Sequence, residues 1–216
     1  SAPLPTKLSK LRLSLVPLAF ETYYATGFGF KNLTTEEYIR DKQFEEIGVG
    51  IKIDDDPAYW FSGSHEEIKD HLTHLTDWSD AALLCHNTLF DGAILAWRFG
   101  IRPAFYLDTL CMARALHGVE VGGSLKALAE RYNIGAKGTE VINAMGVRRT
   151  EFTEEGLAAY GDYCINDVDL TYTLFDRLMV GKNFPTQEIK LIDLTLRMFT
   201  EPVLRLDKEL LQQHLI

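Results

Sequence analysis

A glutamate at position 21 lies in a segment with the pattern of a buried strand, two residues after an alanine. Side chains on a strand alternate between its faces, so Leu18 and Phe20 are expected to point into a core while Ala19 and Glu21 point the other way. An aspartate at position 19 would place two carboxylates side by side, and such a pair repels unless a cation lies between them. Taken alone, Glu21 is better explained as an exposed strand glutamate.

Two further pairs of polar residues have helical spacing. Asn87 follows a short apolar run and could cap a helix, and Asp91 lies four residues later on the same helix face. Tyr163 and Asp167 are also four residues apart, at the edge of the apolar stripe of a long helix. Each pair alone can be ordinary helix chemistry, either a cap with a first-turn acid or a surface tyrosine beside an aspartate. The three segments together, in this order, are much less expected by chance.

Composition and charge restrict the class of protein. The 216 residues are 46% hydrophobic and 11% aromatic, which suits one packed core and argues against disorder. No apolar run approaches the roughly 20 residues of a membrane helix, and the first residues do not resemble a signal peptide. The three cysteines lack metal-type spacing and indicate a reducing compartment, so we expect a cytoplasmic protein of a bacterium or a phage-infected cell. The net charge of −9 argues against tight nonspecific duplex binding, although bound divalent cations could mediate phosphate contacts.

Strand and helix patterns predict a mixed sheet flanked by helices, the ribonuclease H-like architecture of the α/β class. An antiparallel meander is expected over 18–24, 44–53 and 58–61, followed by strands at 81–85 and 104–107. Short helices are expected after Thr34 and Ser64, and further helices over 89–99, 109–116, 124–132, 154–178 and 187–199. Pro17 conflicts with a central strand because it has no N–H to donate, so the strand is expected to start at or just after Pro17, or to bulge there.

The three motifs resemble the proofreading 3′→5′ exonuclease domain of family A DNA polymerases, within the DEDD exonuclease superfamily. The first motif resembles Asp-x-Glu with alanine in place of aspartate, and Tyr163-x-x-x-Asp167 is typical of the DEDDy subclass. The stretches 107–114 and 123–129 support the resemblance, and Glu21-Thr22-Tyr23-Tyr24 is similar to phage polymerases in particular. We therefore expect one exonuclease domain over 1–216, with a core of about 13–180 and a helical transition over 181–216 toward a polymerase module.

The resemblance implies two-metal hydrolysis of the 3′-terminal phosphodiester in single-stranded DNA or a frayed primer end. Mg²⁺ or Mn²⁺ would be held by Glu21, Asp91 and Asp167, with the acid expected at position 19 bridging both ions. Tyr163 would orient the attacking water, and Asp108 would have a structural role. The residues implied to bind substrate are Thr22, Tyr23, Tyr24, Asn87, Leu89 and Phe90.

Alanine at position 19 offers no side-chain oxygen, so we expect very weak metal binding and little hydrolysis. Because every other motif residue is retained, an engineered Asp→Ala change is favoured over a natural loss. Two alternatives remain open. The chain could be a free-standing DEDDy exonuclease acting on DNA or RNA, or a non-catalytic nucleic-acid-binding module.

Overall fold

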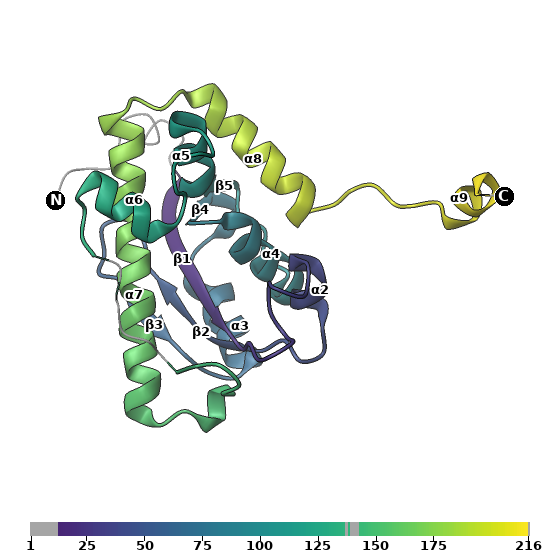
Figure 1. Cartoon of the computed structure of the whole chain (residues 1–216), viewed down its shortest axis with the longest axis horizontal. Coiled ribbons are helices and arrows are strands. Elements are labelled where there is room, and N and C mark those ends of the chain that lie inside the picture. Colours follow the sequence, from purple (N-terminus) through teal and green to yellow (C-terminus); the bar gives the residue numbers. More distant parts are fainter. Residues whose placement is uncertain (1–12, 137, 139–142, 216) are drawn as a thin grey trace.

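A five-stranded mixed sheet lies between two layers of helices in the computed structural model of the chain (Figure 1). The structure describes residues 13–136, 138 and 143–215, so the first twelve residues of the predicted domain lie outside it. The α-helices of the described residues are α2 (Thr35–Arg40), α3 (His65–Leu75), α4 (Thr88–Phe99), α5 (Thr109–His117), α6 (Leu125–Tyr132), α7 (Glu154–Asp176), α8 (Thr186–Thr200) and α9 (Lys208–His214). No helix in this part of the chain combines the length and hydropathy needed to cross a membrane.

The sheet has the strand order β3-β2-β1-β4-β5. The central strand β1 (Ser14–Thr22) pairs antiparallel with β2 (Glu46–Ile51), which pairs antiparallel with β3 (Tyr59–Phe61). On its other side, β1 runs parallel to β4 (Ala81–Cys85), which runs parallel to β5 (Phe105–Asp108). The predicted meander followed by alternating strands and helices is therefore confirmed.

The two faces of β1 pack against different helices, as the alternation of its residues predicts. Phe20 stacks on Phe99 of α4, with ring centroids 5.7 Å apart. On the opposite face, the Ala19 carbonyl accepts a hydrogen bond from the Cys164 thiol of α7 at 3.4 Å. The long α7 crosses this face of the sheet, and in Figure 1 it runs along the side of the sheet away from α8 and α9.

Pro17 lies inside β1, so the expectation that the strand starts after it or bulges there is wrong. Within a strand, the N–H and C=O of one residue point to the same side. The carbonyl of Pro17 accepts from the backbone N–H of Lys52, one residue beyond the end of β2. The missing N–H therefore falls where the β1–β2 ladder ends, and it removes no bond between the two strands. The irregularity in β1 lies further on, between Glu21 and Thr22.

Two glycines make room for the indole of Trp60 between the sheet and α7. A Cβ built on Gly161 would lie 2.6 Å from Cδ1 of Trp60, and a Cβ on Gly48 would also overlap the ring. The indole is enclosed on both sides and cannot move away from an added methyl group.

Gly161→Ala is therefore expected to lower the free energy of unfolding by roughly 1–3 kcal/mol, because the overlap outweighs the better helix propensity of alanine. Urea denaturation measures the change. Gly181→Ala is the matched control, since a Cβ there meets nothing within 4 Å. Equal stability of the two variants would contradict this packing.

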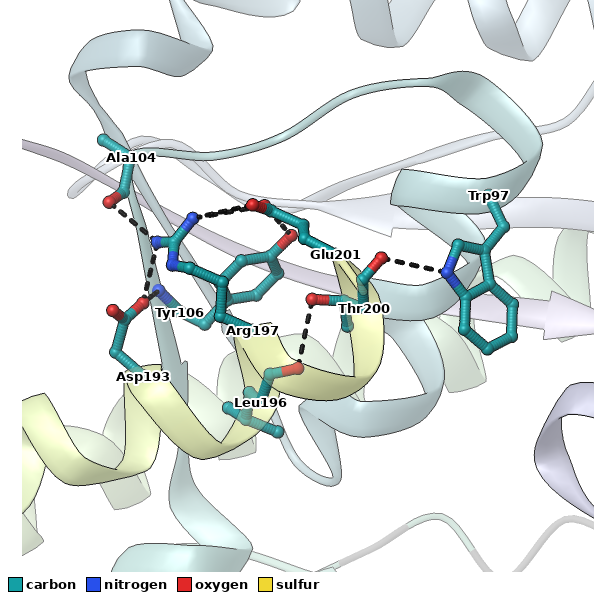
Figure 2. Close-up of polar contacts among 8 residues, drawn as sticks. All are labelled: Trp97, Ala104, Tyr106, Asp193, Leu196, Arg197, Thr200 and Glu201. Carbon is teal, nitrogen blue, oxygen red and sulfur yellow. Dashed lines mark hydrogen bonds and ion pairs between the residues drawn. The ribbon is translucent and has the colours of Figure 1, made fainter. Parts of the chain in front are cut away.

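The end of α8 is fixed to the edge of the sheet through Arg197 (Figure 2). The guanidinium pairs with Asp193 at 2.9 Å and with Glu201 at 3.1 Å. It also lies over the Tyr106 ring, 5.0 Å from the centroid. Trp97 of α4 donates from its indole nitrogen to the carbonyl at the last residue of α8 at 2.9 Å. Beyond this point the chain extends away from the sheet and ends in α9 (Figure 1).

Arg197→Leu is expected to lower the free energy of unfolding by about 2 kcal/mol, because it leaves two largely buried carboxylates facing each other without their cation. Partial exposure of the guanidinium keeps the effect below that of a fully buried pair. Arg102→Leu removes an exposed arginine and is the control in the same denaturation experiment. A loss no larger than that of the control would show that Arg197 does not hold α8 in place.

Candidate functional site

The predicted site residues converge where the end of β1 meets α4 and α7. In the first turn of α4, the Oδ1 atom of Asp91 accepts a hydrogen bond from the backbone N–H of Phe20 at 2.8 Å, and this bond is buried. From α7, the thiol of Cys164 donates to the carbonyl of Ala19. Two helices distant in sequence are thus attached to the backbone of consecutive residues of β1.

Three carboxylates act electrostatically on the buried Cys164 thiol. Burial raises the pKa of this thiol well above its ordinary value, and the charges of Glu21, Asp167 and Asp91 raise it further. One oxygen of Asp167, Oδ1, is itself buried. The three acids that the sequence singled out as metal ligands therefore lie within electrostatic range of one thiol, on β1, α4 and α7.

The Asp91 carboxyl is unusually basic. Burial is the main cause that raises its pKa to about 8, and the negative charges of Glu21 and Asp108 act in the same direction. The hydrogen bond from Phe20 lowers the pKa but does not compensate for burial. Without a cation nearby, Asp91 is mainly protonated at neutral pH.

Two tyrosines of α7 lie near these acids. Tyr163 is half-buried, and a Cβ on Gly138 would lie 3.2 Å from its ring, so the connection after α6 passes beside it. Tyr160 forms a hydrogen bond with the carboxylate of Glu21. Burial raises the pKa of the Tyr160 hydroxyl, and the charge of Glu21 raises it further. The sequence placed Tyr160 only in the apolar stripe of α7; its position seven residues before Asp167, on the same helix face, was the pattern that could have identified it.

A cavity of about 610 Å³ opens beside Glu21. Much of its wall is aromatic, and Tyr24 and Phe30 are the exposed members, at 38% and 58%. Of the residues implied to bind substrate, the cavity is lined by Thr22, Tyr24 and Phe90, whereas Tyr23, Asn87 and Leu89 lie outside its lining. The aromatic residues in the wall are Phe20, Tyr24, Phe28, Phe30, Tyr38, Phe90 and Tyr160.

The two residues that follow the first motif make internal contacts. The hydroxyl of Thr22 is buried and forms a hydrogen bond with the hydroxyl of Tyr38 at 2.9 Å. The ring of Tyr23 lies under the guanidinium of Arg148, 3.5 Å from the centroid. Arg148 also pairs with Glu45 at 2.9 Å. The two contacts of Arg148 hold the segment that precedes α7 beside the end of β1. These contacts position the cavity wall.

The start of α4 is held by Asp108. Asn87 occupies the predicted N-cap position, in a left-handed conformation with φ of 80°, but its side chain makes no capping hydrogen bond. Instead, the Asp108 carboxylate accepts from the backbone N–H groups of Asn87 and Thr88, at 3.1 and 3.0 Å. The side chain of Asn87 is left exposed at the surface. Asp108 has the structural role expected from the sequence.

The donors suit a hard divalent cation in type but not in arrangement. Mg²⁺ and Mn²⁺ prefer oxygen ligands, which Glu21, Asp91 and Asp167 would supply. Among residues 13–136, 138 and 143–215, however, no three His, Cys, Asp or Glu side chains are arranged to hold a metal ion. Position 19, between the two attached helices, contributes only its backbone.

Comparison with known proteins identifies a family and a fold. The sequence profile of the 3′–5′ exonuclease family matches residues 35–180, which include Asp91, Tyr163 and Asp167 and begin after the strand that holds Ala19 and Glu21. A comparison with curated protein sequences gives no match.

Solved nucleases share the fold at low sequence identity. NrnC of Brucella melitensis is 17% identical over 92% of this chain and 89% of its own, with a TM-score of 0.64. Other structures of that protein contain Mg²⁺ or pGG. Trypanosoma brucei RNase D in complex with RNA U12 is 16% identical over 93% of this chain and 69% of its own, with a TM-score of 0.63. Escherichia coli RNase D is 15% identical over 92% of this chain and 48% of its own, with a TM-score of 0.59.

These likenesses confirm the ribonuclease H-like mixed sheet flanked by helices. The profile match spans more than half of the chain and contains three of the acidic and tyrosine positions that meet beside β1. The chain belongs to the 3′–5′ exonuclease family.

Proposed function

We propose that this chain has the substrate site of a nuclease that removes nucleotides one at a time from single-stranded 3′ ends, and that Ala19 leaves its hydrolysis weak. The observation that carries the proposal is that Glu21, Asp91 and Asp167 all act on the thiol of Cys164, which is bonded to the Ala19 carbonyl, while Asp91 is bonded to the backbone of Phe20. Acids from three separate elements, one of them protonated by burial, have no evident use in a purely structural core.

The cavity beside Glu21 suits a nucleobase. Aromatic side chains stack on bases without strong sequence preference, at about 1–3 kcal/mol per base. Tyr24 and Phe30 are exposed in its wall and are available for such stacking, and Phe90 is half-buried behind them. The 3′-terminal base in this cavity would put its phosphodiester near Glu21.

The roles of the side chains follow from their positions. With an acid at position 19, divalent ions would supply Lewis-acid stabilisation of the phosphodiester. Glu21, Asp91 and Asp167 would hold these ions, and Tyr163 would orient the attacking water. Tyr160 keeps the Glu21 carboxylate in place through its hydroxyl. The Mg²⁺ in NrnC supports this choice of metal.

Free-standing action on short or single-stranded RNA or DNA is favoured over proofreading within a DNA polymerase. The solved structures that share the fold are described as NrnC and RNase D, and they contain pGG in one case and RNA in another. Proofreading of a frayed primer by a family A polymerase, in a bacterium or a phage-infected cell, is the second candidate, which the similarity of Glu21-Thr22-Tyr23-Tyr24 to phage polymerases favours.

Polarity and substrate class are tested with aspartate restored at position 19. The same oligonucleotide, as DNA and as RNA, is labelled at either end and incubated with Mg²⁺. We expect a ladder that shortens by single nucleotides from the 3′ end, and Ala19→Asp combined with Glu21→Gln as an inactive control. A rate on RNA or very short oligonucleotides at least equal to that on DNA would support free-standing action. Internal cuts, or shortening from the 5′ end, would refute the proposal.

A further inference from the structure

A second cavity, of about 590 Å³, lies at the C-terminal end of α7 and is lined by basic residues. Its lining consists of His117 from α5, Arg131 and Tyr132 from α6, and Arg177, Gly181 and Lys182 from the π-helical turn η3 (Arg177–Gly181) and the residue after it. It contains three permanent cations and no carboxylate, in a chain whose net charge is −9.

The cations of this cavity are not used in ion pairs. Elsewhere, Arg40, Arg98, Arg148 and Arg197 each pair with a carboxylate. Among the described residues, no ion pair involves any of the three cavity cations. Their charges are therefore available to a ligand.

Two of the helices that line the cavity are joined by a hydrogen bond. The imidazole of His117 and the hydroxyl of Tyr132 form a hydrogen bond of 2.6 Å, which links the end of α5 to the end of α6. Burial lowers the pKa of His117, and the nearby charges of Arg131 and Lys182 lower it further. Arg131 and Lys182 thus both lie close enough to the His117 ring to affect its pKa.

The negative C-terminal ends of the helices neutralise only part of the positive charge of these three cations. The helices α5 and α6 and the end of α7 with η3 all terminate here, and each C-terminus carries about half a negative charge. Three unit charges against about 1.5 leave a positive excess of roughly 1.5. This excess is what a phosphate ligand would neutralise.

We propose that this cavity binds backbone phosphates of the nucleic-acid strand whose 3′ end lies beside Glu21, a proposal that rests on the function proposed above. Arg177 follows Asp167 by ten residues along α7 and η3, a distance of about 15 Å at the rise of a helix. The connection after α6 leads from the cavity back to the site, since the Ala136 carbonyl accepts from Asn166 at 3.2 Å and Gly138 lies beside Tyr163. A strand must be several nucleotides long to reach both places.

The test is binding by the original Ala19 chain, which should not degrade its ligand. Fluorescence anisotropy compares a three-residue and a fifteen-residue oligothymidylate across a salt series. Arg131→Gln, Arg177→Gln and Lys182→Gln are combined in one variant. Lys42→Gln, Lys69→Gln and Arg102→Gln, all exposed and outside the lining of both cavities, form a control of equal charge change. Thermal denaturation confirms that both variants remain folded.

We expect the cavity variant to bind the long oligonucleotide about tenfold more weakly, with a salt slope smaller by about 2, while its affinity for the short one is unchanged. Equal losses in both variants, or unchanged affinity for the long oligonucleotide, would overturn the proposal. Pyrophosphate binding lost in the cavity variant while the long oligonucleotide still binds normally would assign the cavity to a free phosphate ligand, and would also overturn it. If the original chain bound neither oligonucleotide, the proposed function itself would fail.

Discussion

Ala19→Asp is expected to raise Mg²⁺-dependent 3′ hydrolysis by roughly 10³-fold or more. A carboxylate at this position would lie beside Glu21, on the face of β1 that α7 covers, and would add an oxygen donor to acids that are not arranged to hold a metal ion without it. Stabilising the transition state by several kcal/mol through bound ions corresponds to such a factor. The rate is measured on a labelled single-stranded oligonucleotide, with and without Mg²⁺.

The same substitution should make stability depend on metal. In EDTA, an added carboxylate beside Glu21 is expected to lower the melting temperature because like charges repel. Millimolar Mg²⁺ or Mn²⁺ should reverse the loss in the Ala19→Asp variant and have little effect on the original chain. Ala19→Asn, which adds a side chain of similar size without a charge, is the control for steric effects. If the Ala19→Asp variant is inactive and its melting temperature does not change with metal, the assignment of a metal site beside position 19 is wrong.

Asp91→Asn is expected to stabilise the protein by several kcal/mol at pH 9 in EDTA, and far less at pH 5. The pKa of Asp91 is raised from 3.8 to about 8 in the fold, mainly by burial. Each unit corresponds to about 1.4 kcal/mol. Asparagine keeps an oxygen that can accept the hydrogen bond from the Phe20 N–H, and it carries no charge to bury.

The pH window follows from the direction of the shift. Between pH 3.8 and about 8 the folded state holds a proton that the unfolded state has lost, so the original chain loses stability as the pH rises. Above pH 8 both states are ionised and the loss is complete. Urea denaturation from pH 4 to pH 9 should show this fall for the original chain and a flatter profile for Asp91→Asn. Asp162→Asn, on the exposed side of α7, is the control. Parallel profiles for Asp91→Asn and the original chain would show that the buried carboxyl does not titrate in this range.

Local patterns predicted most of the fold. The helices α2 and α3 begin after Thr34 and Ser64 as predicted, and in the structure each has a capping box with the glutamate three residues on, Glu37 and Glu67. The run 81–85 forms β4 with the same bounds, and Gly100 ends α4 in a left-handed conformation. Strand alternation likewise predicted the two faces of β1.

The features that were missed depend on partners distant in sequence. Pro17 is tolerated in β1 because of where β2 stops, which no local pattern reveals. Asp108, at the end of the next strand, accepts the hydrogen bond from the backbone N–H of Asn87, so the start of α4 does not depend on the Asn87 side chain. The hydrogen bond from Tyr160 to Glu21 joins α7 to β1, so a residue that has the pattern of core packing also belongs to the site.

The hydrogen bond from Cys164 to the carbonyl of Ala19 forms with any side chain at position 19, so mutations at this position can accumulate without loss of the contact. The fold uses position 19 through its main chain, so the side chain there can be exchanged with little effect on the architecture. Aspartate and alanine codons can differ by a single base. One point mutation can therefore silence the chemistry while the scaffold persists, and one reversion can bring it back.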